Sequence, residues 1–292
     1  MQNSSPELPD PLRRLELASF GPGSSGATRT YFGNEFCERL IPSPPQATAA
    51  VRRAGEEGRA ITLVLPVLGP AAFERAAQVL DAVARAAPGT EVVANDWGVL
   101  RRAASDERLV VVMGRCLNRT IRDPRLPVHV GEQMPPAARE ALRGGPFRSR
   151  AFRALRERYR VSRLEIDVPP LGIAEAAFPD DLPLSVYLPF GFVASGRICV
   201  FAAAHRPDGP ERMSVGECRY ECATASLLLT GGQAANGLEL RLRGNTVFYR
   251  HDARLEAEAL AAASRFPIDR VVWQPDVPMW RPRDLAQGEA GE

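Results

Sequence analysis

Residues 61–94 read ITLVLPVLGPAAFERAAQVLDAVARAAPGTEVVA, and this stretch decides the fold. It begins with a nearly continuous apolar run at 61–66 and ends with a second one at 91–94. Between the two runs, apolar side chains recur every three or four residues, as on one face of an α-helix. They are Phe73, Ala76, Ala77, Leu80, Val83, Ala84 and Ala87. A strand, a helix and another strand in succession indicate a parallel sheet whose strands are buried on both faces.

The same alternation continues along the chain. Further strands are predicted at 15–20, 109–113, 163–168, 184–188 and 270–273, with helices at 147–159 and 255–263. Six or seven strands in this succession favour a TIM-barrel-like parallel (β/α) barrel over an open sheet. Residues 238–249 differ, because leucines alternate with charged residues before a Gly-Asn turn. This pattern predicts an added β-hairpin near the C-terminus.

The domain boundaries follow from composition. We expect one domain over residues 13–280, a disordered, proline-rich lead-in at 1–12 and a polar tail at 281–292. The chain has 292 residues and a formal net charge of +2, which gives no reason to expect nucleic-acid binding. It has no apolar run of about 18 residues and no apolar segment typical of a secretory signal. These features predict a cytoplasmic protein, in which spaced cysteines more often bind metal or act in catalysis than form disulfides.

Four of the five cysteines are spaced like metal ligands. Cys218 and Cys222 form a C-x3-C pair, 18 residues separate Cys199 from this pair, and Cys37 lies far upstream. Four thiolates are the ligand set of a [4Fe–4S] cluster or of a structural zinc site. Four ordinary buried cysteines are the third alternative. Zinc sites usually present two closely spaced pairs, so this spacing favours the cluster. We expect Cys116 to be a thiol that binds no metal.

Other polar residues follow the predicted strands, where a barrel places its active site. Asn95 and Asp96 come directly after the strand at 91–94. Asp96 is a candidate cap for the next helix, and Asn95 is a candidate ligand-facing residue. Arg115 and Arg122 follow the strand at 109–113, in a segment that also carries two further arginines, Arg119 and Arg125. They suit a carboxylate- or phosphate-bearing ligand, or they form local ion pairs on a solvated loop.

A hydrolase has little support. The chain contains no G-x-S-x-G elbow, no H-E-x-x-H pair and no phosphate-binding loop, and its three histidines form no recognisable catalytic triad. A hydrolytic mechanism would have to use Asp96 or Asp167 as its acid/base groups.

Several of these motifs together resemble the collagenase-like peptidase family. They are YFGNEFCER at 31–39, NDWGVL at 95–100, GRCLN at 114–118 followed by RDPR at 122–125, and YLPFGF at 187–192. The resemblance covers about residues 13–275 and implies a TIM-barrel-like fold. It also implies a [4Fe–4S] cluster bound by Cys37, Cys199, Cys218 and Cys222. The spacing of Cys199 and Cys218 is longer than in the family pattern, which implies an insertion around residues 205–210.

The resemblance is strongest to a branch of the family that works without oxygen. It implies a heterodimer with a UbiU-like partner, which hydroxylates the quinone-precursor ring in anaerobic ubiquinone biosynthesis. Two alternatives stay open. One is a non-catalytic subunit stabilised by its cluster, with the hairpin at 238–249 as a candidate contact. The other is a peptidase, as the family name suggests.

Overall fold

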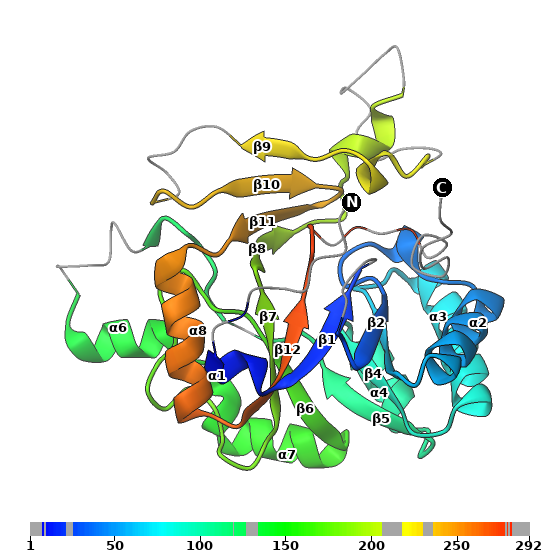
Figure 1. The fold of residues 1–292 in the computed structure, drawn as a ribbon, viewed down its shortest axis with the longest axis horizontal. Coiled ribbons are helices and arrows are strands. Elements are labelled where there is room, and N and C mark those ends of the chain that lie inside the picture. Colours follow the sequence, from blue (N-terminus) through cyan, green and yellow to red (C-terminus); the bar gives the residue numbers. More distant parts are fainter. Residues whose placement is uncertain are drawn as a thin grey trace.

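The computed structural model describes residues 8, 10–21, 26–118, 120–126, 134–205, 218–229, 236–277, 279 and 281. Eight parallel strands form a closed barrel in the order β1-β12-β7-β6-β5-β4-β3-β2 (Figure 1). They are β1 (Glu16–Phe20), β2 (Arg29–Gly33), β3 (Ala60–Leu65), β4 (Thr90–Ala94), β5 (Leu109–Met113), β6 (Val161–Ile166), β7 (Leu184–Leu188) and β12 (Ile268–Trp273). The predicted TIM-barrel-like fold is confirmed.

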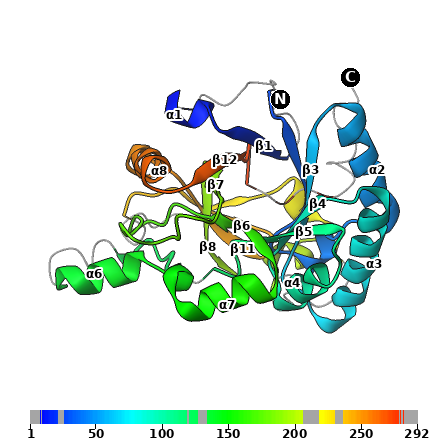
Figure 2. The ribbon, with the colours of Figure 1, turned by 90° about the horizontal axis from the view of Figure 1, so that it is seen from below.

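Helices surround the barrel (Figure 2). They are α1 (Asp10–Arg13), α2 (Pro44–Glu56), α3 (Pro70–Ala86), α4 (Trp97–Ala104), α6 (Pro136–Arg143), α7 (Arg150–Arg158) and α8 (Ala253–Arg265). The helix α3 shows why they form, since Pro70 begins it and one face buries Ala76, Leu80 and Val83. Short 3₁₀ turns lie at η1 (Glu38–Leu40), η2 (Pro146–Arg148), η3 (Val200–Ala203) and η5 (Glu221–Ala223).

A second sheet covers the end of the barrel to which the strands point (Figure 1). Its strands are β8 (Phe190–Ser195), β9 (Leu227–Leu229), β10 (Leu240–Arg243) and β11 (Thr246–Arg250), in the order β8-β11-β10-β9. All three pairings in it are antiparallel. The predicted hairpin is confirmed as β10–β11, and it is part of this larger sheet. The sheet is inserted between β7 and α8, so it places loop residues over the carboxyl ends of the barrel strands.

Three strands were missed by the sequence prediction: β2, β8 and the three-residue strand β9. The strand β2 was read as part of a long loop because it begins with two polar residues and ends in glycine. Gly33 has φ +125°, and a Cβ there would lie 2.1 Å from the Val64 carbonyl oxygen, so only glycine fits. Cys37 therefore follows the second barrel strand, not the first. The strand β8 was read as the loop after β7, from which only Pro189 separates it.

The predicted lead-in at 1–12 is wrong at its C-terminal end. Leu8 and Leu12 are buried in the main core, and α1 begins at Asp10. Apolar contacts with the core therefore order the part of this segment that is described. The rest of the lead-in lies outside the described residues, as do Arg119, the predicted insertion beyond His205 and the tail after Arg281.

Candidate metal centre

A cavity of about 510 Å³ lies between the carboxyl ends of the barrel strands and the antiparallel sheet. It is lined by residues that follow β2, β3 and β5 and by residues of the sheet. All five cysteines contribute to its wall: Cys37, Cys116, Cys199, Cys218 and Cys222. The structure thus brings the four predicted ligands together, although they come from distant parts of the chain. It also places Cys116, which we expected to bind no metal, in the same wall.

Local hydrogen bonds fix the segment that carries Cys37. The Asn34 side-chain oxygen accepts hydrogen bonds from the backbone N–H groups of Phe36 and Cys37, both at 2.8 Å. Cys37 then precedes η1 in an extended conformation. Glu38, the first residue of η1, accepts a hydrogen bond at 2.6 Å from the backbone N–H of Gly69, in the loop after β3. Two loops at the end of the barrel are therefore joined beside the cavity.

Three of the remaining cysteines lie in or beside short turns. Cys199 precedes η3, and Cys222 lies within the buried part of η5. The Cys116 backbone N–H donates to the Asn95 side-chain oxygen at 3.1 Å, and its thiol donates to the Glu35 carbonyl oxygen at 3.7 Å. Cys116 therefore has a partner of its own on the barrel side of the cavity.

The surroundings of the thiols are apolar. Phe36, Phe192, Phe201 and Phe248 form a buried cluster together with Cys222, and Cys37, Cys116 and Cys199 pack against it. Burial raises the pKa of Cys37 to about 11 and that of Cys222 to about 12, with neighbouring thiols adding to both effects. Burial also raises the pKa of Cys199. Burial therefore disfavours free thiolates at these positions, and a bound metal would supply a compensating positive charge.

Two kinds of metal site use thiolate ligands like those that line this cavity. No group of three or more His, Cys, Asp or Glu side chains in the described part of the chain is close enough to hold one metal ion. A single zinc ion needs its sulfur ligands about 2.3 Å from one point. A [4Fe–4S] cluster places each thiolate on a different iron, so its ligands stand farther apart.

Arg115 lies below the cavity in a buried ion-pair network. Its Nε and Nη2 donate to the Glu35 carboxylate at 3.0 and 2.5 Å, and its Nη1 donates to Asp167 at 2.6 Å. The guanidinium also stacks on the Tyr187 ring, 3.6 Å from its centroid. Arg115 is fully buried, so its planar donors are used by the protein's own carboxylates. The structure gives it no free donor edge for the carboxylate-bearing ligand that the sequence suggested.

Arg122 shares this network but also reaches the cavity wall. Its Nε donates to Asp167 at 2.6 Å, and its Nη2 donates to the Arg115 carbonyl oxygen at 2.8 Å. Burial alone would raise the pKa of Asp167, but Arg115 and Arg122 outweigh it and hold that pKa below its usual range. Arg125 instead pairs with Asp123 on the surface, as the alternative of local ion pairs predicted.

The side chains of Asn95 and Asp96 form hydrogen bonds with backbone groups. Asp96 caps α4 by accepting hydrogen bonds from the N–H groups of Gly98 at 2.7 Å and Val99 at 3.3 Å, which confirms the capping prediction. The Asn95 amide donates to the Leu65 carbonyl oxygen at 3.2 Å, and its oxygen accepts from Cys116. Neither residue lines the cavity, so the structure gives no support to Asn95 as a ligand-facing group.

Sequence reasoning missed three residues that shape this site. Glu35 is fully buried and completes the Arg115 network, while Arg243 and Asn245 flank the hairpin turn that lines the cavity. The only signal for them was position, since Glu35 lies two residues before Cys37 and the other two lie at the predicted turn.

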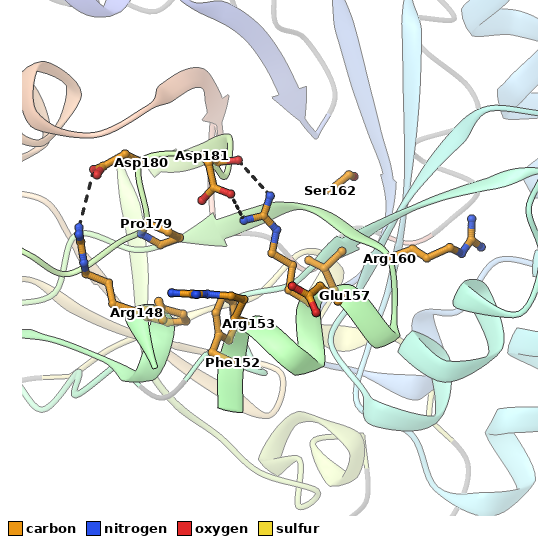
Figure 3. A pocket seen from close by; sticks show the side chains of 12 residues that line it. Arg148, Phe152, Arg153, Glu157, Arg160, Ser162, Pro179, Asp180 and Asp181 are labelled. Atoms are coloured by element: carbon orange, nitrogen blue, oxygen red, sulfur yellow. Dashed lines mark hydrogen bonds and ion pairs between the residues drawn. The ribbon is translucent and has the colours of Figure 1, made fainter. Parts of the chain in front are cut away.

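A larger groove of about 850 Å³ lies at the opposite, amino-terminal end of β6 and β7 (Figure 3). Figure 3 shows Arg148 facing Asp180. These two side chains pair at 3.7 Å, and Arg156 pairs with Asp181 at 2.9 Å. Among the described residues, no cysteine or histidine lines this groove. Residues at this end of a TIM barrel usually serve stability, so we place the chemistry at the cysteine cavity.

Comparisons with known proteins leave the function open. No protein-family model matches the sequence, and no curated protein matches it. Similar solved structures include a chitinase-like agglutinin from Robinia pseudoacacia, with 12% identity, a TM-score of 0.34 and 94% and 99% of the two chains covered. A family 18 N-acetylglucosaminidase from Paenibacillus barengoltzii has 12% identity, a TM-score of 0.34 and coverage of 94% and 100%.

The spore cortex-lytic enzyme SleL from Bacillus cereus has 9% identity and a TM-score of 0.36, with 94% of this chain and 74% of that chain covered. Likenesses this low carry no argument about activity. The barrel assignment rests on the strand order of this structure. Among the described helices, none is long and apolar enough to span a membrane.

Proposed function

We propose that the protein holds a [4Fe–4S] cluster on Cys37, Cys199, Cys218 and Cys222. The observation that carries this proposal is the convergence of the four cysteines on one cavity at the end of the barrel where chemistry is usual. The aromatic cluster around the thiols limits water, which would influence the reduction potential of a bound cluster. When bound, the cluster would supply one-electron chemistry, while the chain holds its sulfur ligands and shields them.

We further propose that the protein is a UbiV-like member of the collagenase-like peptidase family. In this role it would act with a UbiU-like partner in oxygen-independent hydroxylation of the quinone-precursor ring. The support is that three of the motifs of the resemblance contribute to the cavity wall. The segment 31–39 contributes Cys37, the segment 114–118 contributes Cys116, and the segment 187–192 contributes Phe192.

The carboxylates near the cavity argue against a peptidase. Hydrolysis by general acid–base catalysis needs a carboxylate that can reach the substrate. Glu35 and Asp167 are buried in ion pairs with arginine, and Glu38 accepts a backbone hydrogen bond from Gly69. Glu35 and Asp167 are therefore not free acids or bases, and the Glu38 carboxylate, which lines the cavity, is held toward the Gly69 backbone.

A non-catalytic subunit is the second candidate, and exposed apolar side chains favour it. Val67 and Tyr220 line the cavity and are 40% and 38% exposed. Leu227, Leu228 and Leu229 form the edge strand of the sheet and are at least 40% exposed. An apolar edge strand is a surface to which another protein can add. The chain would then contribute its cluster and this surface to a complex in which the partner catalyses the reaction.

Two cysteine variants test the cluster. Purification without oxygen should give a protein with broad visible absorbance, which Cys222→Ala loses and the matched control Cys116→Ala keeps. Equal absorbance in wild type and Cys222→Ala would refute the assignment of the ligands.

Growth without oxygen tests the wider function. Deletion of the gene should lower the ubiquinone content of cells grown anaerobically and leave that of aerobic cells unchanged. Complementation with wild type, but not with Cys222→Ala, should restore it. An unchanged anaerobic ubiquinone content would exclude the proposed role and leave the cluster assignment standing.

A further inference from the structure

The hairpin of the second sheet ends inside the cysteine cavity. Gly244 and Asn245 connect β10 to β11, and both residues line the cavity wall. Gly244 has φ +61°, and a Cβ at this position would lie 3.2 Å from the Met279 sulfur and 3.6 Å from the Cys222 Cβ. The turn therefore packs closely against the segment that carries one predicted ligand.

Asn245 joins the segments of two other predicted ligands. Its side-chain amide donates to the carbonyl oxygen of Phe36 at 2.9 Å and to that of Gly196 at 2.5 Å. Phe36 directly precedes Cys37, and Gly196 lies three residues before Cys199. The Gly196 N–H also donates to the Asn245 carbonyl oxygen at 2.9 Å. Both N–H donors of the amide are therefore used to hold two loops at a fixed separation.

Arg243 holds the third segment from the other side of the turn. Its Nε donates to the Cys222 carbonyl oxygen and its Nη2 to that of Ala223, both at 2.6 Å. Its Nη1 donates to the Asp276 carboxylate and to the Val277 carbonyl oxygen, both at 2.8 Å. Arg243 is only 3% exposed, so these bonds are made away from water and fix η5 to the segment after β12.

We infer that the turn Arg243–Asn245 is the positioning element of the metal centre. It holds the segments of Cys37, Cys199 and Cys222 in the arrangement that a cluster needs before the cluster binds. This inference rests on the proposed function, because it takes these cysteines as the ligands. Residues that orient metal ligands through hydrogen bonds typically change metal affinity by about 10- to 100-fold when they are replaced.

The first test compares variants of the turn with a variant of the same hairpin. Asn245→Asp keeps the size of the side chain but presents a carboxylate to two carbonyl oxygens. Arg243→Lys keeps the charge but loses the forked donors. Arg241→Lys is the matched control, because the Arg241 side chain pairs with Glu239 beside the turn. The readouts are the rate of iron loss to a chelator and the electron paramagnetic resonance signal of the reduced protein.

We expect iron loss to be roughly 10- to 100-fold faster in Asn245→Asp and Arg243→Lys than in wild type, with an altered resonance signal. Arg241→Lys should match wild type in both readouts. Wild-type rates and signals in both turn variants would overturn the inference.

A second test does not need the cluster. In a chain carrying Cys116→Ser, Cys218→Ser and Cys222→Ser, a short bifunctional thiol reagent should link Cys37 to Cys199. Adding Asn245→Asp should reduce the yield of this link several-fold, while adding Arg241→Lys should not. Equal yields would overturn the inference even if wild type binds no cluster. Absence of iron from wild type together with the expected change in yield would instead count against the proposed function alone.

Discussion

Replacing Glu165 by glutamine should remove a pH-dependent loss of stability from the barrel. Glu165 is fully buried, and one of its oxygens accepts a hydrogen bond from the Tyr31 hydroxyl at 2.9 Å. The other oxygen has no hydrogen-bond partner among the described residues. The charged groups that act on it are Arg270, Arg163 and Glu91, yet burial dominates and raises the pKa of Glu165 to about 7.

The magnitude follows from the difference in pKa between the folded and unfolded states. The ordinary value for glutamate is 4.5. Between this value and about 7, folded Glu165 keeps a proton that the unfolded chain has lost, so its contribution to stability falls as the pH rises. A difference of about 2.5 pKa units corresponds to about 3 kcal/mol. Relative to wild type, Glu165→Gln should therefore gain roughly 2–3 kcal/mol of unfolding free energy between pH 5 and pH 8.

Urea unfolding of both proteins at pH 5, 6, 7 and 8 measures this difference. Burial lowers the pKa of His251 to about 4, which makes the stability rise with pH over a lower range. Because both proteins keep His251, its contribution cancels in the difference between them. A difference that stays constant within about 0.5 kcal/mol across this range would refute the assignment of a protonated, buried Glu165.

Three further substitutions test the packing around the site. Arg115→Met should lower the unfolding free energy by about 3–5 kcal/mol, because it leaves the buried Glu35 carboxylate without a cation and leaves Asp167 with Arg122 alone; a loss below about 1 kcal/mol would contradict the ion-pair network. Gly33→Ala should cost about 3 kcal/mol or more, because its Cβ would meet a strand carbonyl oxygen. The control Gly58→Ala, at φ +66° with open space around it, should cost only about 1–2 kcal/mol, and equal losses would show that the close approach does not matter. Asp96→Ala should cost about 1 kcal/mol through loss of the helix cap and leave the iron content unchanged, whereas a loss of iron would assign Asp96 to the metal centre.

Most of the strands predicted from the sequence are runs of mainly apolar residues, so burial alone identifies them, as in β3 and β5. The hairpin was predicted instead from leucines that alternate with charged residues before a Gly-Asn turn. The three missed strands gave neither signal clearly, and β9 is only three residues long. The start of β2 is polar, and β8 continues from β7 after one residue but pairs with a different sheet. A change of pairing partner depends on contacts distant in sequence, which local patterns do not contain.

The candidate site, like the fold, could be predicted only in part from the sequence. The cysteine spacing predicted which residues would meet, and the structure brings them to one cavity. Their binding of a metal stays a prediction. The partners of Arg115 could not be predicted, because Glu35 lies 80 residues before it and Asp167 lies 52 after it. The contact between Asn245 and Phe36 spans 209 residues, so only the folded chain shows that the hairpin reaches the cysteines.

The most direct test of the central claim is the metal and sulfide content of the wild-type protein purified without oxygen. The account predicts about four irons and four acid-labile sulfides per chain. About one zinc per chain without sulfide would show a structural ion site instead. A folded protein with neither metal would contradict the claim that this cavity is a metal centre.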